Sequence, residues 1–387
     1  MDDFDYLGEG EVYLDGACQS LRPRCVIDAL NGYYTRHNSC GERVKYRWGR
    51  ETDEKVEETR ALVLKYLGLK AKDYVVSYTL NTTYGINLLL SQIKPELFDK
   101  VVTSDIEHNS PFLATMAYAK KNGVERVVTT RNDDGSVPVK GYDFHKALVV
   151  LNCASNVDGR RLQNIEEVVK AVHKGGGVIV IDAAQAMGHS AEILQKTEAD
   201  AVCFSAHKMY APSLGVMVVR RDLFKKIDTT FIGGGMVDDV ELNSYELSAN
   251  SANHAYTKFE AGLQAWGEIV ALGEAIRWLN GIGTQDRKNL AERTQKLYDF
   301  LSAQPKVHMV NHKVNPTISF YIKGLDSHMV GEALSRENIM VRTGYFCAHY
   351  YLDHVKKYPP LIRFSLGYHI REEDVDKTID VMKKILG

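Results

Sequence analysis

The stretch "ADAVCFSAHKMYAPSLGVMVV", residues 199–219, decides the fold of this chain because polar side chains interrupt two apolar runs. The first run, residues 201–204, stops at Ser205, and the second begins at residue 215. Short and nearly continuous apolar runs of this kind are typical of strands buried on both faces of a sheet. The stretch therefore predicts two interior strands, with His207 and Lys208 held between them.

Similar apolar runs recur earlier in the chain and alternate with segments of helical period. The runs lie at residues 75–78, 101–104, 126–130, 147–153 and 178–183. Helical patterns lie between them, for example in residues 83–93 and 164–175, and the second of these ends in Lys-Gly, a common stop signal. This alternation predicts an α/β domain with a doubly wound, mainly parallel sheet.

The pattern changes from about residue 255 onward. A long helical region covers residues 259–283, a short strand follows at residues 317–322, and an amphipathic helix ends the sequence. That last helix has acids first and lysines last, which suits the helix dipole. We expect a large α/β domain over residues 22–265 and a smaller α+β domain formed by residues 1–21 and 266–387.

Composition and charge exclude several classes of protein. The chain of 387 residues is 44% hydrophobic and 25% charged, as is ordinary for a soluble globular protein. A formal net charge of -2 gives no general attraction to nucleic acid or to an anionic membrane. No apolar run approaches the roughly 20 residues of a membrane helix, and the acidic N-terminus does not resemble a signal peptide. Six cysteines without a CxxC pair predict neither a zinc site nor a disulfide framework, so we expect a cytoplasmic protein without a metal.

Polar side chains follow several predicted strands, at the edge where ligands bind to open parallel sheets. Thr82 and Thr83 lie at a strand-to-helix junction and can either bind phosphate or act as plain helix caps. Asp182 ends a strand, and Gln185 follows it. A buried carboxylate there needs a cation, although a helix cap or a structural salt bridge would also account for it.

Two further candidates carry nitrogen. Lys208 follows a strand directly, where partial desolvation favours a neutral, nucleophilic amine, unless the side chain extends to water. His108 follows the run at residues 101–104 and can stack on an aromatic ligand or cap a loop. A phosphate cradle, a carboxylate, an amine and a flat ring together meet the needs of pyridoxal 5'-phosphate (PLP). We therefore expect PLP as the cofactor.

The chain also resembles a known family over nearly its whole length. The resemblance rests, in order, on "YLDGACQS", "NTTYGINLL", "EHN", "SNVDG", "IDAAQA", "FSAHKMYAPSLGVMVV", "KFEAG", "VRTGYFCA" and "IRFSLGYHIREEDVDKTI". These segments are similar to the class V aminotransferases among the fold-type I PLP enzymes, and within them to the SUF-type cysteine desulfurases and selenocysteine lyases. The resemblance implies PLP, L-cysteine as substrate, a homodimer, a sulfur-acceptor protein and a role in iron–sulfur cluster assembly.

The resemblance also implies roles for individual residues. Lys208 corresponds to the lysine that bonds to the cofactor aldehyde, Cys347 to the cysteine that accepts sulfur, and His108 to a catalytic residue stacked on the ring. The implied cofactor contacts are Thr82, Thr83, His108, Asn156, Asp182, Gln185, Ser205, His207 and Lys208. The implied substrate contacts are Asn156, Arg342 and Arg363. Cys18 stands in an unexpected place, because the chain reads "YLDGACQS" where "YLDNAA" is common.

Other functions stay open at this point. One alternative is another class V PLP enzyme, such as a lyase, an epimerase, an aminotransferase or a kynureninase-like enzyme, acting on a different amino acid. A nucleotide-binding protein of the same fold class is a second, but no GxGxxG or GxxxxGK[ST] motif follows a strand. A non-catalytic scaffold in a sulfur-transfer complex is a third, and the presence of every ring-contacting residue argues against it.

Overall fold

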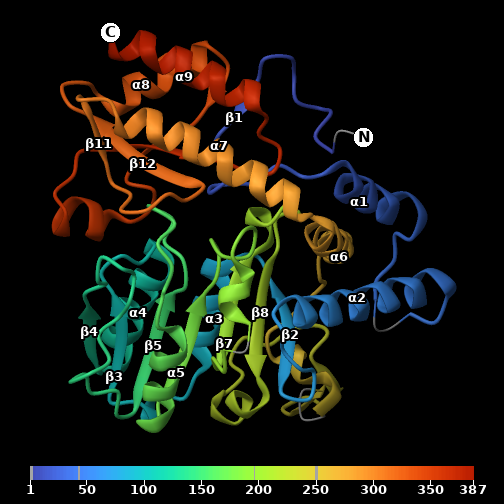
Figure 1. Ribbon diagram of the computed structural model, residues 1–387. Coiled ribbons are helices and arrows are strands. Elements are labelled where there is room, and N and C mark those ends of the chain that lie inside the picture. Colours follow the sequence, from blue (N-terminus) through green and yellow to red (C-terminus); the bar gives the residue numbers. More distant parts are fainter. Residues whose placement is uncertain (1–2, 42–43, 196, 249–251) are drawn as a thin grey trace.

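The computed structural model describes residues 3–41, 44–195, 197–248 and 252–387, and within them a seven-stranded sheet forms the centre of the larger domain. The strand order is β2-β8-β7-β6-β5-β3-β4 (Figure 1). The strands are β2 (Tyr74–Thr79), β3 (Lys100–Ser104), β4 (Glu125–Thr129), β5 (Ala147–Asn152), β6 (Val178–Asp182), β7 (Ala201–Ser205) and β8 (Gly215–Arg220). Each apolar run of the sequence is a strand of this sheet, and the predicted fold class is confirmed.

The direction of β8 follows from the length of the turn before it. β8 runs antiparallel to both of its neighbours, β2 and β7, whereas the other neighbouring strands are parallel. A parallel crossover needs a dozen or more residues, and the connection of residues 206–214 is shorter than that. The chain therefore turns straight back, and Lys208 lies in a tight turn between two paired strands.

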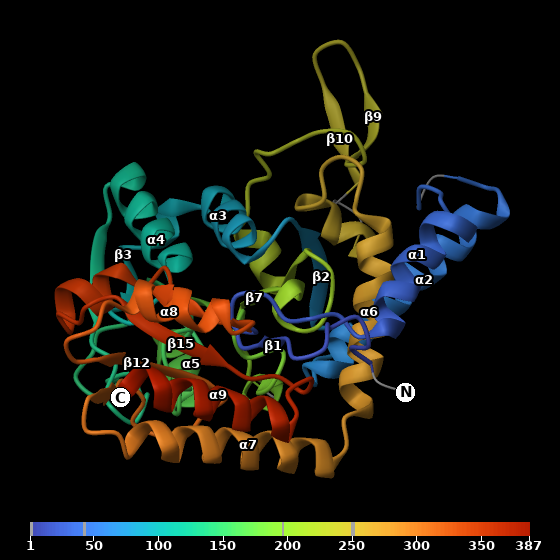
Figure 2. The same ribbon diagram turned by 90° about the horizontal axis from the view of Figure 1, so that it is seen from above.

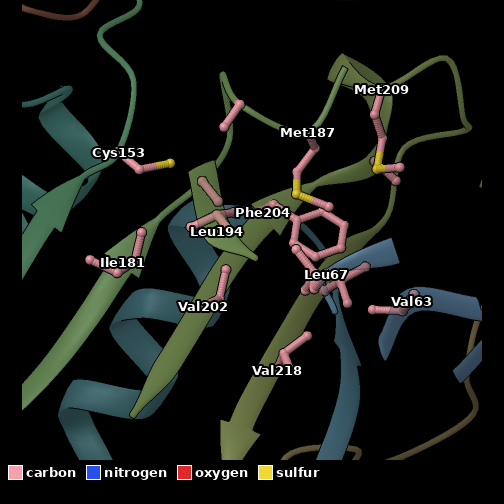
Figure 3. Packing of buried hydrophobic residues seen from close by; sticks show 14 of the residues in the cluster. Val63, Leu67, Cys153, Ile181, Met187, Leu194, Val202, Phe204, Met209 and Val218 are labelled. Carbon is pink, nitrogen blue, oxygen red and sulfur yellow. The ribbon is translucent and has the colours of Figure 1, made fainter. Parts of the chain in front are cut away.

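Helices cover both faces of the large sheet. They are α1 (Arg24–Arg36), α2 (Arg47–Tyr66), α3 (Thr82–Gln92), α4 (Asn109–Asn122), α5 (Ile165–Lys174) and α6 (Trp266–Gly281). Successive residues of a strand point to opposite faces, so Val149 packs in the cluster with α2, α5 and α6, and Val150 packs in the cluster with α3 and α4. Figure 3 shows the first cluster, where Phe204 lies close to Met187 and Leu67. Both faces of the sheet are therefore covered by apolar side chains of the helices, which explains the continuous apolar runs of its strands.

Helix α6 begins later than the helical pattern suggests. The pattern predicts a helical region from residue 259, but the helix starts at Trp266. Gly262 has a φ of 83°, a left-handed conformation that ends a regular helix and that glycine adopts freely. α6 packs against α1 and α2 and shares their hydrophobic cluster, although it follows the predicted domain boundary at residue 265. That boundary stays a prediction.

The smaller domain contains an antiparallel sheet with the order β11-β12-β15-β14, stacked on one end of the large sheet (Figure 1). Its strands are β11 (Val307–Met309), β12 (Thr317–Ile322), β14 (Arg342–Gly344) and β15 (Leu361–Ser365). Its helices are α7 (Thr284–Ser302), α8 (Ser327–Arg336) and α9 (Glu372–Leu386). The N-terminal strand β1 (Val12–Tyr13) pairs with β13 (Ile339–Met340), which attaches the N-terminal segment to the smaller domain.

A hairpin leaves the body of the molecule. It consists of β9 (Val237–Val240) and β10 (Tyr245–Leu247), and it projects well beyond the helices in Figure 2. Val240, Leu242 and Tyr245 on this hairpin are exposed. In the part of the chain that the structure describes, no helix has both the length and the apolar character needed to cross a bilayer.

Candidate active site

A cavity of about 270 Å³ lies at the carboxyl ends of the parallel strands, beneath the smaller domain. Ligands of open α/β sheets bind at this edge. The sequence-predicted residues that line it are Thr82, Thr83, His108, Asn156, Asp182, Gln185, Ser205, His207, Lys208, Arg342, Cys347 and Arg363. The structure therefore brings every predicted site residue to one cavity, although these residues are spread over more than half of the chain.

Hydroxyl groups gather at one end of the cavity, around the start of α3. Thr82 donates its backbone N–H to Ser205 Oγ over 2.8 Å, and the two side-chain hydroxyls are 2.6 Å apart. Thr83 Oγ1 lies 2.6 Å from Ser110 Oγ, at the start of α4. Two helix N-termini and four hydroxyls form a site suited to a phosphate group. Sequence reasoning missed Ser110, although its place two residues after His108 at a helix start is a usable signal.

The amine and the carboxylate lie at the ends of neighbouring strands. Asp182 ends β6, and Lys208 follows β7 in the turn Ala206–Lys208. Burial lowers the pKa of Lys208, and the charge of Asp182 offsets part of this shift. Burial likewise raises the pKa of Asp182, while a 2.9 Å hydrogen bond from the Ala184 N–H and the charge of Lys208 oppose the rise. The cavity thus favours a neutral amine that can act as a nucleophile or a base.

His108 both caps a helix and lines the cavity. It precedes α4, and its Nδ1 accepts a 3.0 Å hydrogen bond from the Ser110 N–H. Burial, with help from the charges of Lys208 and Arg363, lowers the pKa of His108 to about 3. The ring is therefore neutral at physiological pH, which suits a flat face packed against an aromatic ligand.

Arg363 and Asn156 line the cavity and are linked to each other. Arg363 on β15 donates to the Asn156 backbone oxygen over 3.0 Å and to Asp15 Oδ1 over 3.2 Å. Asn156 donates from Nδ2 to the Phe346 backbone oxygen over 2.5 Å. Among the described residues, Arg363 Nε and Asn156 Oδ1 are buried without a hydrogen-bond partner. Buried polar atoms are normally paired, so both atoms indicate a polar ligand. The donor Arg363 Nε suits a carboxylate, whereas the acceptor Asn156 Oδ1 suits an N–H or O–H group.

Cys347 borders the cavity on a strained loop. Cys347 is exposed, and its backbone oxygen accepts a 2.6 Å hydrogen bond from the Asn109 N–H. Phe346 and Cys347 have φ values of 49° and 57°, and Gly344 has 111°. Left-handed backbone at a residue other than glycine costs on the order of 1 kcal/mol or more, so the contacts from Asn109 and Asn156 hold the loop in place.

Gln185 joins the cavity to the N-terminal turn. Its Nε2 donates to the Ala17 backbone oxygen over 2.7 Å, and the next residue, Cys18, also lines the cavity. In the sequence Cys18 is distant from the other site residues, because this contact joins residues that are 168 positions apart. Asn152 and Phe346 are two further lining residues that sequence reasoning missed.

A buried ion pair supports the sheet edge behind the cavity. Glu107 Oε2 accepts from the Asn152 N–H over 2.8 Å, and Arg131 donates to Asn152 Oδ1 over 3.0 Å. Glu107 and Arg131 themselves lie 3.5 Å apart. Burial raises the pKa of Glu107 to about 7, although Arg131 opposes the shift.

A family model described as aminotransferase class V matches residues 12–378. The chain belongs to this family. A probable cysteine desulfurase of Pyrococcus abyssi is 30% identical, in an alignment that covers 97% of this chain and 94% of the relative. A probable cysteine desulfurase of Vibrio cholerae is 27% identical, with the same coverage of both chains.

Solved structures agree with this assignment to the class V aminotransferases. The apo structure of a cysteine desulfurase from Thermococcus onnurineus has a TM-score of 0.87 and 27% identity, and covers 98% of this chain and 95% of that one. A cysteine desulfurase from Escherichia coli has a TM-score of 0.88 at 22% identity, with coverage of 99% and 96%, which shows the shared fold. The predicted family is thereby confirmed.

Proposed function

We propose that the protein is a PLP-dependent cysteine desulfurase, which converts L-cysteine to L-alanine and keeps the sulfur as a persulfide on Cys347. One observation carries the proposal: the exposed residue Cys347 borders the same cavity as the half-buried Lys208 and the buried Asp182. A carbon–sulfur lyase that stores sulfur needs both a base at the substrate carbon and a nucleophile at its sulfur. The relatives named above carry the same activity in their names.

The residues of the cavity fit PLP. The hydroxyls at the start of α3 suit its phosphate, and the buried Nδ1 of His207 has no hydrogen-bond partner among the described residues. Asp182 suits the pyridine nitrogen, and Lys208 suits the aldehyde. When bound, the cofactor supplies a reversible covalent bond to the amino group and an electron sink for bond breaking at the substrate Cα.

Each side chain then has a defined task toward the cofactor. Thr83, Ser205 and His207 would hold the phosphate, with Thr82 beside them. Asp182 would keep a proton on the ring nitrogen, and Gln185 would donate to the ring hydroxyl. His108, neutral at physiological pH, packs its ring against the heterocycle.

The substrate binds beside Arg363 and Asn156. Arg363 Nε is an unpartnered donor, so Arg363 binds the substrate carboxylate, and the unpartnered Oδ1 of Asn156 accepts a hydrogen bond from a donor of the substrate or cofactor. Arg342, on β14 before Cys347, contributes a second cation to the cavity. Lys208 removes the proton from the substrate Cα as a general base, because burial favours its neutral form.

Cys347 performs the sulfur step. Its thiolate attacks the substrate sulfur, a new sulfur–sulfur bond forms, and the substrate carbon–sulfur bond breaks with its electron pair returning to carbon. Protonation of that carbon gives alanine, and Cys347 carries a persulfide. A thiol or an acceptor protein then collects the sulfur.

Incubation of the PLP-loaded protein with L-cysteine tests this function. We expect alanine and protein-bound sulfane sulfur in equal amounts, and we expect Cys347→Ser to lose the bound sulfur while it keeps the visible absorbance of the bound cofactor. Cys40→Ser is the matched control, since Cys40 is exposed and lies outside the cavity. Alanine without bound sulfur, or no alanine at all, contradicts the proposal and points to another class V reaction.

We also propose a homodimer, a cytoplasmic location and a part in iron–sulfur cluster assembly. The exposed apolar side chains of the β9–β10 hairpin support the dimer. All six cysteines lie in the described part of the chain and are free thiols, which supports a reducing compartment.

A further inference from the structure

Two thiols, not one, line the candidate active site. Cys18 is partly exposed, Cys347 is exposed, and both border the same cavity of about 270 Å³. The other cysteines lie elsewhere: Cys153 and Cys203 are buried in the two sheet clusters, and neither Cys25 nor Cys40 lines the cavity. The mechanism above uses only Cys347, which leaves Cys18 unexplained.

The turn that carries Cys18 is held firmly against the site. The Cys18 N–H donates to the Asp15 oxygen over 3.0 Å, which closes the turn. The Ala17 N–H donates to Ser365 Oγ over 3.0 Å, and the Ala17 oxygen accepts from Gln185. The position of Cys18 at the cavity wall is therefore fixed by both domains.

Arg363 contacts the segments of both cysteines. Its Nη2 lies 3.2 Å from Asp15 Oδ1, in the turn of Cys18, and its guanidinium carbon lies 4.7 Å from the centre of the Phe346 ring, next to Cys347. One buried cation thus bridges the two segments. The unpartnered Arg363 Nε and Asn156 Oδ1 in this part of the cavity show that it is built for a polar ligand.

Two arginines line the cavity together with the two thiols. Arg342 and Arg363 border it, as do Cys18 and Cys347. Sulfur exchange moves negative charge from one cysteine sulfur to the other, and a guanidinium group in the same cavity is a suitable counter-charge for this step.

We propose that Cys18 is a second sulfur carrier, which takes the outer sulfur from the Cys347 persulfide; this inference rests on the proposed function. The Cys18 thiolate attacks the outer sulfur, a sulfur–sulfur bond forms at Cys18, and the sulfur–sulfur bond at Cys347 breaks. Cys347 leaves as a thiolate. The number of sulfur atoms and electrons is unchanged, so no oxidant or reductant is needed.

The transfer has two consequences. Cys347 becomes free for a second turnover while the first sulfur waits on Cys18, so each chain stores twice the sulfur of a single carrier. Cys18 is also less exposed than Cys347, so its persulfide is better protected from thiols in solution.

Sulfur counting without an added reductant tests the proposal. The PLP-loaded enzyme receives L-cysteine in small molar excess, and after quenching we measure alanine and map sulfane sulfur on each cysteine by alkylation and peptide mass spectrometry. We expect sulfur on both Cys18 and Cys347 in the wild type, and half the bound sulfur and half the alanine burst in Cys18→Ser and Cys18→Ala. Cys347→Ser should leave Cys18 without sulfur, because the second carrier is loaded through the first.

Cys40→Ser is the control and should match the wild type. Equal bound sulfur in the wild type and both Cys18 variants overturns the proposal, as does a disulfide between Cys18 and Cys347 with release of free sulfide. Sulfur on Cys347 with none on Cys18 overturns this inference alone. Absence of alanine from the wild type overturns the proposed function as well, so the two failures can be told apart.

Discussion

At the scale of single residues, the polar ends of the cavity are the most informative feature. Arg363 is a planar cation with one hydrogen bond to Asn156 and one to Asp15, and its Nε is left over for a ligand. A lysine cannot reproduce this arrangement of several N–H donors in one plane, because its ammonium is a single point charge.

The variant Arg363→Lys tests the role of the planar guanidinium group. We expect the catalytic efficiency with L-cysteine to fall roughly 10- to 100-fold, which is the loss of one or two hydrogen bonds to a charged group. The fall should come mainly from KM, and the visible absorbance of the bound cofactor should persist. Steady-state alanine formation measures it, and an unchanged KM would count against a carboxylate at Arg363.

Glu107 gives a prediction for the pH dependence of stability. Its folded pKa of about 7 lies above its ordinary value of 4.5, so the folded state holds a proton that the unfolded state releases. Stability therefore falls as pH rises through this window, by on the order of 3 kcal/mol once the pH exceeds 7. We expect Glu107→Gln to remove this loss of stability at high pH. Between about pH 5 and pH 8, the melting temperature of the wild type should therefore drop further than that of the variant.

The exposed residue Glu96 supplies the control for this experiment. Glu96→Gln should keep the wild-type pH dependence, because the side chain of Glu96 lies in solvent. Parallel melting curves of the wild type and Glu107→Gln across this pH range would refute the assignment.

At the scale of elements, the segment from Gly344, the last residue of β14, to Cys347 combines strain with function. Gly344 has a φ of 111°, and a Cβ atom built there would meet only His328 Cε1, at 3.7 Å. Space is therefore available, and a side chain at this position costs backbone energy rather than a steric clash.

The variant Gly344→Ala separates strain from packing. The unfavourable φ costs about 1–3 kcal/mol, so we expect persulfide formation on Cys347 to slow roughly 10-fold while cofactor absorbance is unchanged. Gly281→Ala, at the end of α6, is the matched control, because its φ is ordinary and its Cβ would meet nothing within 4 Å. Equal rates in both variants would mean that the loop conformation does not matter for sulfur transfer.

Elements were predictable where a local pattern decides them. The apolar runs identify the strands of the large sheet, and Asp182, Ser205 and Lys208 could be placed at strand ends because each directly follows such a run. The reversal of β8 could have been deduced from the short turn before it. The site residue Cys18 could not be assigned, because its position depends on a contact with a distant segment, which periodicity does not encode.

At the scale of the whole molecule, the exposed hairpin is the feature that a single chain does not explain. Leu242 is 95% exposed at its tip, and Val240 and Tyr245 are exposed beside it. Clustered exposed apolar side chains on a projecting element are typical of a protein interface.

The variant Leu242→Glu tests the proposed dimer. A buried charge without a partner is costly, so we expect the dissociation constant of the dimer to rise at least 10-fold and monomer to appear in light scattering after gel filtration. Leu325→Glu is the control on an exposed leucine of another segment. A wild type that is monomeric at all concentrations, or a variant that stays fully dimeric, would refute this use of the hairpin.

The contact between Asp15 and Arg363 also determines when the cavity can form during synthesis of the chain. The two residues are 348 positions apart, and Asp15 also forms a parallel bridge with Ser365, two residues after Arg363. A ribosome makes Asp15 348 residues before Arg363. The wall of the cavity is therefore completed only after β15 has been made, and a nascent chain that lacks β15 has no finished pocket for a ligand to enter.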